Sequence, residues 1–360
     1  MTGLNKTFQV VVLLLVGITG ANGQRSDHSI SERELQAAFK QIVGEYDSFE
    51  AVHGNSITTP NVNMHYLTWG KNTDRVFVWI HGTTSNAYEA ALFADSLVSN
   101  GYFVIAVDYY GHGKTPIPAR EVSIYNVADD IHFLLTTLKI DKVTIGGWSR
   151  GGTIATAFYD TYPDMVSAIV LEDGGSVGWL RPGHRMEGSE LAKLFDDNKQ
   201  QYGEVPADKL FPSLYDAFRH HQHDGKLRLL TFHAINKTTT GQWGVNPGLA
   251  EWLGEESWES IVKSINRPAA APLFEFSTMT LDPRIAYRNL KVPMLIFDPI
   301  DVNDQLKDFH QDNAHLKNEH PDLVTHLVYD NTSHAVKYQR PDRFREDLVA
   351  FLKGVESEGP

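Results

Sequence analysis

Short apolar runs that alternate with helix-length segments limit the folds open to this chain more than any other feature. Eight runs predict strands, around Ile57 and at residues 64–68, 76–80, 103–107, 143–145, 168–171, 294–297 and 326–329. From residue 76 onward these runs are mostly continuous, as in strands buried on both faces. Segments such as 87–100 and 122–138 have helical length between them. The pattern predicts an α/β fold with a mostly parallel eight-stranded sheet flanked by helices.

The alternation stops between about residues 174 and 289. This block is rich in aromatic residues, and it has apolar residues at helical spacing between 249 and 265. We therefore expect a mainly helical lid at 176–289, inserted after the sixth strand, and a core formed by 56–175 and 290–360. The lid aromatics are Trp179, Trp243, Trp252, Trp258, Phe274 and Phe276. Packing is their ordinary role, although an aromatic lid would suit an apolar or aromatic substrate group.

The first 55 residues contain two further segments. Lys6 precedes an almost unbroken apolar run over 8–18, and the small residues Ala21 and Gly23 directly precede a cleavage position, which is typical of a secretory signal peptide at 1–23. The run is too short to span a bilayer, which needs about 20 apolar residues. A leader at 24–55 follows, with a capping box from Ser31 to Glu34 that predicts an amphipathic helix. We expect export to a secreted or periplasmic location and no stable membrane insertion after cleavage.

Charge and cysteine content exclude several classes of function. The formal net charge of the 360 residues is −13, and loss of Lys6 with the signal peptide makes it one unit more negative. Such a chain repels nucleic acid phosphates, so no nucleic-acid partner is expected. The absence of cysteine excludes disulfides, thiolate metal sites and a cysteine nucleophile. Nothing in these numbers predicts an oligomeric state.

A serine lies where a β-branched apolar run meets a helix-like segment. The sequence Gly147-Trp-Ser149-Arg-Gly151 follows the predicted strand at 142–145 and precedes a helix-like stretch at 153–159. A sharp strand-to-helix turn exposes a serine hydroxyl at the carboxyl edge of the sheet, and the flanking glycines avoid clashes across the turn. The helix amino terminus there favours developing negative charge. The alternative is a glycine-rich turn that serves only helix–sheet packing.

Two further loops join this serine in a familiar order. The strand at 76–80 leads into His81-Gly-Thr83, and the strand at 103–107 leads into Asp108-Tyr-Tyr-Gly-His-Gly. With Gly-Trp-Ser149-Arg-Gly, these segments resemble the α/β-hydrolase superfamily over about 56–175 and 290–352. The resemblance implies a lid-bearing serine hydrolase without a cofactor or metal, in which Ser149 is the nucleophile. It also implies that the backbone N–H groups of Thr83 and Arg150 form the oxyanion hole.

A serine nucleophile needs a base, usually a histidine that a carboxylate holds. His334 follows the last predicted strand and precedes Pro341 by seven positions, which resembles the carboxyl-terminal part of the family and implies that it is the base. For the acid, the segment around Val292–Asp304 resembles the seventh strand of the family. Asp301 is preferred there, with Asp298 and Asp304 as competitors. Some relatives carry the acid after the preceding strand instead, which keeps Glu172 and Asp173 as alternatives.

Histidines outside this triad invite a metal-site interpretation. His220, His221 and His223 are clustered, but no His-Glu-x-x-His or comparable spacing is present, so a solvated face of the lid is the better prediction.

The expected activity is cleavage of a carboxylic ester, or a related acyl bond, of a small and apolar substrate through an acyl-enzyme. Lactone, amide and carbon–carbon bond hydrolysis by the same triad remain alternatives. Dehalogenase and the usual epoxide hydrolase chemistry are disfavoured, because both use an aspartate where Ser149 stands. A rival from another class is a hydrolase-fold binding protein that has lost catalysis.

Overall fold

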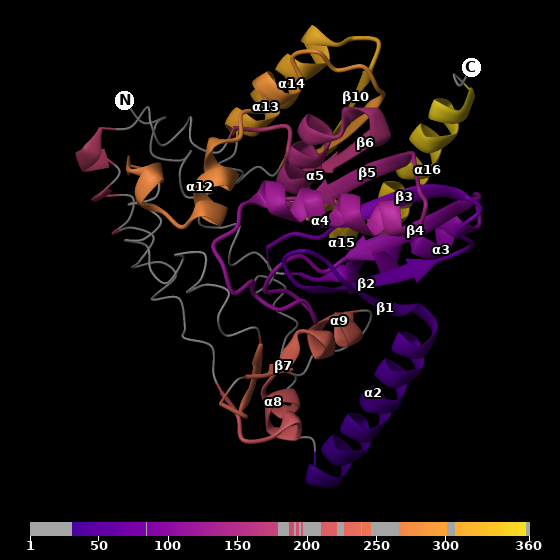
Figure 1. Ribbon diagram of the computed structural model, residues 1–360, viewed down its shortest axis with the longest axis vertical. Helices are drawn as coiled ribbons and strands as arrows, with labels where there is room; N and C mark the ends of the chain where they lie inside the picture. Colours follow the sequence, from indigo (N-terminus) through magenta and orange to yellow (C-terminus); the bar gives the residue numbers. More distant parts are fainter. Residues whose placement is uncertain are drawn as a thin grey trace.

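The fold is centred on an eight-stranded sheet, seen in Figure 1, and all eight predicted strands are present. The computed structural model describes residues 31–83, 85–178, 187–190, 192–193, 196, 210–221, 227–238, 240–245, 266–300 and 307–357. The strand order is β1-β2-β4-β3-β5-β6-β9-β10. Strand β2 runs antiparallel to its neighbours β1 and β4, and the other pairs are parallel. The predicted mostly parallel sheet is therefore confirmed.

The sheet strands are β1 (Gly54–Thr58), β2 (Asn63–Trp69), β3 (Arg75–Ile80), β4 (Tyr102–Val107), β5 (Val143–Trp148), β6 (Val166–Glu172), β9 (Met294–Ile300) and β10 (Val324–Asp330). Strands β4 and β5 are buried at every position, because helices cover both of their faces. Since β3, β4, β5, β6, β9 and β10 are parallel, their carboxyl ends meet at one edge of the sheet. That edge is where loops from distant parts of the chain come together.

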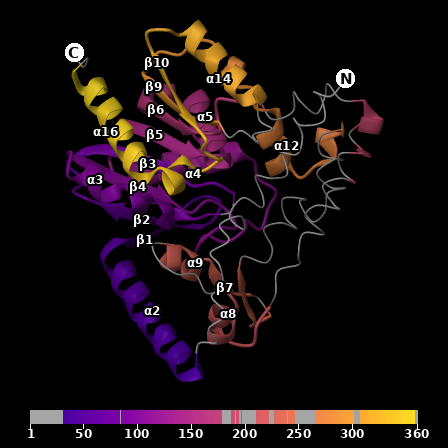
Figure 2. The same ribbon diagram turned by 180° about the vertical axis from the view of Figure 1, so that it is seen from behind.

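Helices pack on both faces of the sheet. One face carries α4 (Ile124–Thr137), α5 (Arg150–Thr161) and α14 (Lys307–Glu319), and the opposite face carries η2 (Ala87–Leu92), α3 (Ala94–Val98) and α16 (Pro341–Ser357). Figure 1 looks onto α4 and α5, and Figure 2, the view from behind, brings α16 to the front. Each face has its own hydrophobic cluster, so the sheet separates two layers of core. The remaining short core helices are η3 (Pro163–Met165) and α15 (Val336–Gln339).

The predicted leader helix is present as α2 (Glu32–His53). Ser31 caps its amino terminus: the Glu34 backbone N–H donates to the Ser31 hydroxyl, and the Ser31 N–H donates to the Glu34 carboxylate at 2.9 Å. The helix runs along one side of the molecule next to α8 and α9, as both views show. Its buried residue Ile42 belongs to the hydrophobic cluster shared with those helices, and Phe39 and Val43 of the same helix pack against it. The leader is therefore packed against the segment between β6 and β9.

The segment between β6 and β9 contains α8 (Leu214–His220), α9 (Arg228–His233), η5 (Pro268–Ala270), α12 (Leu273–Thr280) and α13 (Pro283–Ala286). It also contains a two-stranded antiparallel sheet, β7 (Ile235–Lys237) with β8 (Trp243–Val245), which the sequence analysis did not predict. Strands of three residues are too short to give a periodic signal. The segment at 1–23 predicted to be a signal peptide and the apolar residues at 249–265 lie outside the described residues. Within the described ranges, no helix combines the length and hydrophobicity needed to cross a bilayer.

Candidate active site

Ser149 lies in a strained turn between β5 and α5. Its backbone angles are φ 55° and ψ −123°. Residues other than glycine rarely adopt a positive φ. Ser149 is the N-cap of α5, and the Arg150 N–H that follows has no acceptor within the helix. The turn predicted from the Gly-x-Ser-x-Gly pattern is therefore present, with the serine at the carboxyl edge of the sheet.

The glycines on either side of the serine are required by close backbone approach. A Cβ on Gly151 would lie 2.0 Å from the Ile80 carbonyl oxygen, and a Cβ on Gly147 would lie 2.3 Å from Gly151. Real Cβ atoms do not approach backbone atoms this closely. Helix α5 can thus begin directly above β3 and β5 only because both positions lack a side chain.

The end of β6 lies directly beside the serine. The Ser149 N–H donates to the Glu172 carbonyl at 2.9 Å, and a Cβ on Gly174 would lie 2.2 Å from the Ser149 carbonyl oxygen. Asp173 stands between those two residues, is buried and has φ 44°. Strained backbone at both Ser149 and Asp173 is typical of a site that the surrounding fold holds in place.

His334 approaches the same point from the loop after β10. Its Nδ1 donates to Asp173 Oδ2 at 2.6 Å, and its carbonyl accepts from Trp148 Nε1 at 2.9 Å. The imidazole and indole rings of His334 and Trp148 lie 5.2 Å apart, centroid to centroid. Because Trp148 directly precedes Ser149, these contacts bring the predicted base beside the predicted nucleophile. The ring nitrogen opposite the Asp173 contact is Nε2.

The carboxylate that contacts His334 is Asp173, one of the two alternatives kept after the sixth strand. The preferred Asp301 and its competitor Asp304 lie outside the described residues, so their positions stay a prediction. Asp298 is described, and its Oδ2 contacts His310 and His326. Strands β6 and β9 are neighbours in the sheet, so an acid at the end of either strand reaches the same edge. Sequence spacing alone does not choose between two such strands.

Burial and neighbouring charge affect the acid of this pair. Burial first, then the charges of Asp298 and Glu172, raise the pKa of Asp173 well above its usual range. The hydrogen bond from His334 acts in the opposite direction, because it stabilises the carboxylate. When His334 takes a proton from serine, its imidazole becomes positively charged. That charge stabilises the buried Asp173 carboxylate beside it.

The two predicted oxyanion donors lie at the ends of adjacent strands. Thr83 follows β3, Arg150 follows β5, and these strands are paired in parallel. The His112 Nε2 lies 2.5 Å from the Thr83 carbonyl, which fixes the loop that carries Thr83. The Arg150 side chain is buried and forms an ion pair with Glu275 of α12 at 3.2 Å. The sequence analysis predicted no role for this side chain. This ion pair ties the residue after the nucleophile to the segment between β6 and β9.

A buried lysine lies beneath the site, and the sequence analysis missed it. Lys337 Nζ is 3.1 Å from Glu172 Oε2 and 3.7 Å from Glu89 Oε1, and all three side chains are fully buried. The ammonium also lies 3.5 Å from the centroid of the Trp148 ring. Lys337 is three residues after His334, and Glu172 precedes Asp173. The ion pair therefore fastens the loop of the base to the strand of the acid.

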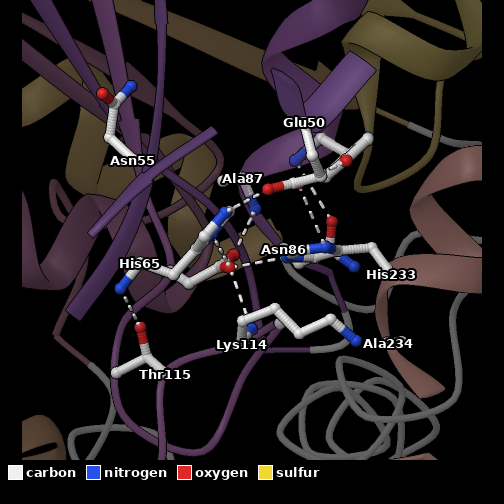
Figure 3. Close-up of polar contacts among 12 residues, drawn as sticks. Glu50, Asn55, His65, Asn86, Ala87, Lys114, Thr115, His233 and Ala234 are labelled. Carbon is white, nitrogen blue, oxygen red and sulfur yellow. Dashed lines mark hydrogen bonds and ion pairs between the residues drawn. The ribbon is translucent and has the colours of Figure 1, made fainter. Parts of the chain in front are cut away.

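A second polar cluster joins the leader helix to the core (Figure 3). Asp108 Oδ2 accepts from His65 Nδ1 and from His233 Nε2, each at 2.7 Å, and His65 Nε2 lies 3.1 Å from the Glu50 carboxylate. Burial lowers the pKa of His65, but its hydrogen bonds with Asp108 and Glu50 outweigh this and bring the pKa to about 9. Since Glu50 comes from α2, His65 from β2 and His233 from α9, the cluster holds three separate segments together.

The lid residues singled out from the sequence have mixed outcomes. His220 and His221 contact each other and Phe211, while His223 lies outside the described residues. Phe274 is buried against Tyr109 and Tyr110, which is the packing role expected of it. Trp179, Trp252 and Trp258 also lie outside the described residues.

Comparison with known proteins gives the family. The sequence model of the alpha/beta hydrolase fold family matches residues 75–341. A Bacillus subtilis protein that carries the provisional name 2-succinyl-6-hydroxy-2,4-cyclohexadiene-1-carboxylate synthase is 31% identical over 132 residues, which are 36% of this chain and 45% of that protein. A Pseudomonas putida 2-hydroxy-6-oxononadienedioate/2-hydroxy-6-oxononatrienedioate hydrolase is 34% identical over 122 residues, which are 33% and 42%. The chain thus matches less than half the length of each of these relatives.

Solved structures match a larger part of the fold. A carboxylesterase structure from the thaumarchaeon Nitrososphaera gargenis has a TM-score of 0.57 at 19% identity, and the match covers 85% of this chain and all of that chain. An esterase from Exiguobacterium antarcticum has a TM-score of 0.54 at 21% identity, with 83% and 99% covered. At these identities the likeness concerns the fold.

Proposed function

Because the chain belongs to the α/β-hydrolase fold family, we propose that it is a serine hydrolase that cleaves a carboxylic ester through an acyl-enzyme. One observation carries the proposal. Ser149 lies in the strained turn after β5, and Trp148 directly before it contacts His334, whose Nδ1 donates to the buried Asp173 at 2.6 Å. A nucleophile, a base and an orienting acid in the chain order Ser149, Asp173, His334 form the triad typical of this fold. Membership of the family by itself supports a hydrolase that acts on a small molecule.

In the proposed reaction, Ser149 Oγ attacks the carbonyl carbon of the ester while His334 Nε2 takes the hydroxyl proton. Asp173 holds the imidazole through Nδ1 and stabilises the imidazolium that forms. The N–H groups of Thr83 and Arg150 donate to the oxyanion of the tetrahedral intermediate. The alcohol leaves with the proton from His334, and an acyl group stays on Ser149. His334 then takes a proton from water as the water oxygen attacks the acyl carbon. The bond from the acyl carbon to Ser149 Oγ breaks, His334 returns the proton to Oγ, and the carboxylic acid leaves.

The substrate is proposed to be small and apolar. The buried aromatic residues of the segment between β6 and β9, among them Phe274, support this preference. Lactones, amides and carbon–carbon bonds are the other substrate classes that the same triad serves. The relative from Pseudomonas putida is named as a hydrolase of 2-hydroxy-6-oxononadienedioate. Carbon–carbon bond hydrolysis is therefore the first alternative to compare with ester hydrolysis.

The test is a substrate panel with a matched inactive variant. The protein is assayed against p-nitrophenyl esters of increasing acyl length, lactones, amides and a vinylogous diketone. Ester hydrolysis should dominate, and Ser149→Ala should lower kcat by at least about a thousandfold, since triad residues contribute this much or more. Full activity in Ser149→Ala would refute the mechanism. A protein that binds these compounds and turns over none of them would instead fit the binding-protein alternative.

We further propose that the chain is exported and loses residues 1–23. Lys6, the apolar run at 8–18 and the small residues at 21–23 support this, since they match the three parts of a signal peptide. The amino-terminal sequence of the protein recovered from outside the cell should begin at Gln24. An intact Met1 on an intracellular protein would contradict the proposal.

A further inference from the structure

We propose that Asp298, His310 and His326 form a binding site for a divalent transition-metal ion of the Zn²⁺ class. The three residues come from β9, α14 and β10, elements that meet beside the candidate active site. The sequence analysis expected no metal, and the spacings between these residues match no ligand motif. Their convergence is visible only in the folded chain. Metal binding at this cluster is also independent of the hydrolase reaction.

The geometry of the three side chains carries the proposal. Asp298 Oδ2 lies 2.7 Å from His310 Nδ1 and 2.5 Å from His326 Nε2, and the three ligand atoms lie within 4.8 Å of one another. Ligand atoms around a tetrahedral Zn²⁺ are about 3.3 Å apart, given metal–ligand distances of about 2.0 to 2.1 Å. An ion between the three atoms therefore needs each imidazole to move by less than about 1 Å from its present place.

The cluster around Asp108 shows what a closed hydrogen-bond network of the same composition looks like (Figure 3). Asp108 also accepts two backbone N–H groups, those of Ala87 at 2.7 Å and Lys114 at 3.1 Å, and the far nitrogens of its two histidines contact Glu50 and a tyrosine hydroxyl. Within the described ranges, the hydrogen-bond partners of the Asp298 carboxylate are the two imidazoles. Among the described residues, the Asp298 cluster therefore has ligand atoms directed at one point and no backbone N–H groups of the kind that close the other network.

Access and charge also separate the two clusters. His310 is 41% exposed, whereas the Asp108 carboxylate and His233 are fully buried. Of these two clusters in the described part of the chain, the one around Asp298 is therefore the more open to an ion from solvent. The Asp298 carboxylate is itself buried close to Asp173, because the Asp173 N–H donates to the Phe297 carbonyl at 3.1 Å. Buried carboxylates need compensating positive charge. The described ion pairs of Lys337 go to Glu89 and Glu172, so they do not supply that charge at Asp298.

The donor set selects the class of ion. Two imidazoles and one carboxylate suit Zn²⁺, Co²⁺ or Ni²⁺, while Mg²⁺ and Ca²⁺ prefer oxygen ligands. Three protein ligands leave at least one position of a four-coordinate ion for water.

The experiment is a metal titration of the full-length protein after chelator treatment. Zn²⁺ is titrated by isothermal calorimetry, and Co²⁺ is followed by the visible absorption of its complex. We expect one ion per chain with a dissociation constant in about the micromolar range or tighter. His310→Ala should weaken binding by at least about a hundredfold, since even the loss of a residue that only supports a ligand costs about ten- to a hundredfold. His326→Ala should have the same effect.

His315→Ala is the matched control. His315 lies on the same helix, is 49% exposed and pairs with Glu319 at 3.1 Å, so its loss should leave binding unchanged. Thermal melting of each variant checks that it is folded, and the exposed position of His310 makes His310→Ala the informative one if His326→Ala fails to fold. No saturable binding to the wild-type protein, or binding that survives His310→Ala, would overturn the proposal. The cluster would then be a hydrogen-bonded group only.

Discussion

Replacing Lys337 with methionine should strongly destabilise the protein. Methionine has a similar length and keeps the packing against the Trp148 ring, but it removes the one ammonium that contacts Glu172 and Glu89. The three side chains are fully buried, so the two carboxylates would be left in a low-dielectric site without a counter-charge. Removing one partner of a buried ion pair costs about 3 to 5 kcal/mol. We expect a loss of that size in the free energy of unfolding at pH 8.

The same reasoning predicts how this loss depends on pH. Burial raises the pKa of Glu172, burial also raises the pKa of Glu89, and in both cases Lys337 lowers it. Without Lys337, both pKa values should rise further. The folded state then binds protons that the unfolded state has released, so stability falls as pH rises from the unfolded pKa, about 4.3, through the raised folded pKa. The variant should therefore be much closer to the wild type at pH 5 than at pH 8.

Urea unfolding at pH 5 and pH 8 measures both effects, and Glu172→Gln in the Lys337→Met background is the control. Because the added substitution removes one of the two uncompensated charges, it should recover part of the loss at pH 8. A loss below about 1 kcal/mol at pH 8, a value expected of exposed ion pairs, would refute the assignment of a buried charge network. A loss that is equal at both pH values would also refute it.

Two further predictions follow from the contacts of the site and of the leader helix. With a p-nitrophenyl ester as substrate, Asp173→Asn should lower kcat by about 10³- to 10⁴-fold, as expected for a triad acid. The kcat of Asp301→Asn should stay within about twofold of the wild type. The opposite result would show that the triad acid lies after β9. For His65, whose pKa of about 9 lies above the unfolded value of 6.5, the stabilisation is fully present below pH 6.5 and is lost as pH rises through 9. Urea unfolding should show a decline of the order of 3 kcal/mol across that window, which His65→Gln abolishes; an unchanged slope in the variant would contradict the assignment.

Much of the sheet could be predicted because each strand has a recognisable pattern within its own short stretch of sequence. A continuous apolar run such as that of β4 or β5 has few structural interpretations other than a buried strand. All eight strands of the sheet were predicted. Ser149 and His334 could be proposed from the sequence for a related reason, since both lie directly after a predicted strand in a turn with its own pattern. These signals are local in sequence, so neither needs knowledge of which segments meet in space.

The acid and the charged clusters depend on such knowledge. Asp173 and Asp301 follow the neighbouring strands β6 and β9, and the contact of Asp173 with His334 is visible only in the folded chain. Lys337 looks like an ordinary helix lysine until Glu89, almost 250 positions earlier, is placed against it. The same is true of His310 and His326, whose shared contact with Asp298 comes from three separate elements. Pairings over such separations leave no signal in a single sequence.

The reactivity of Ser149 is the central claim, and covalent labelling tests it most directly. The folded protein is treated with a fluorophosphonate at neutral pH, digested and examined by mass spectrometry, with heat-denatured protein and His334→Ala as controls. The triad predicts one stoichiometric adduct on the peptide that contains Ser149, absent from the denatured sample and formed far more slowly in His334→Ala. An unlabelled native protein, or an adduct on another residue, would contradict the claim.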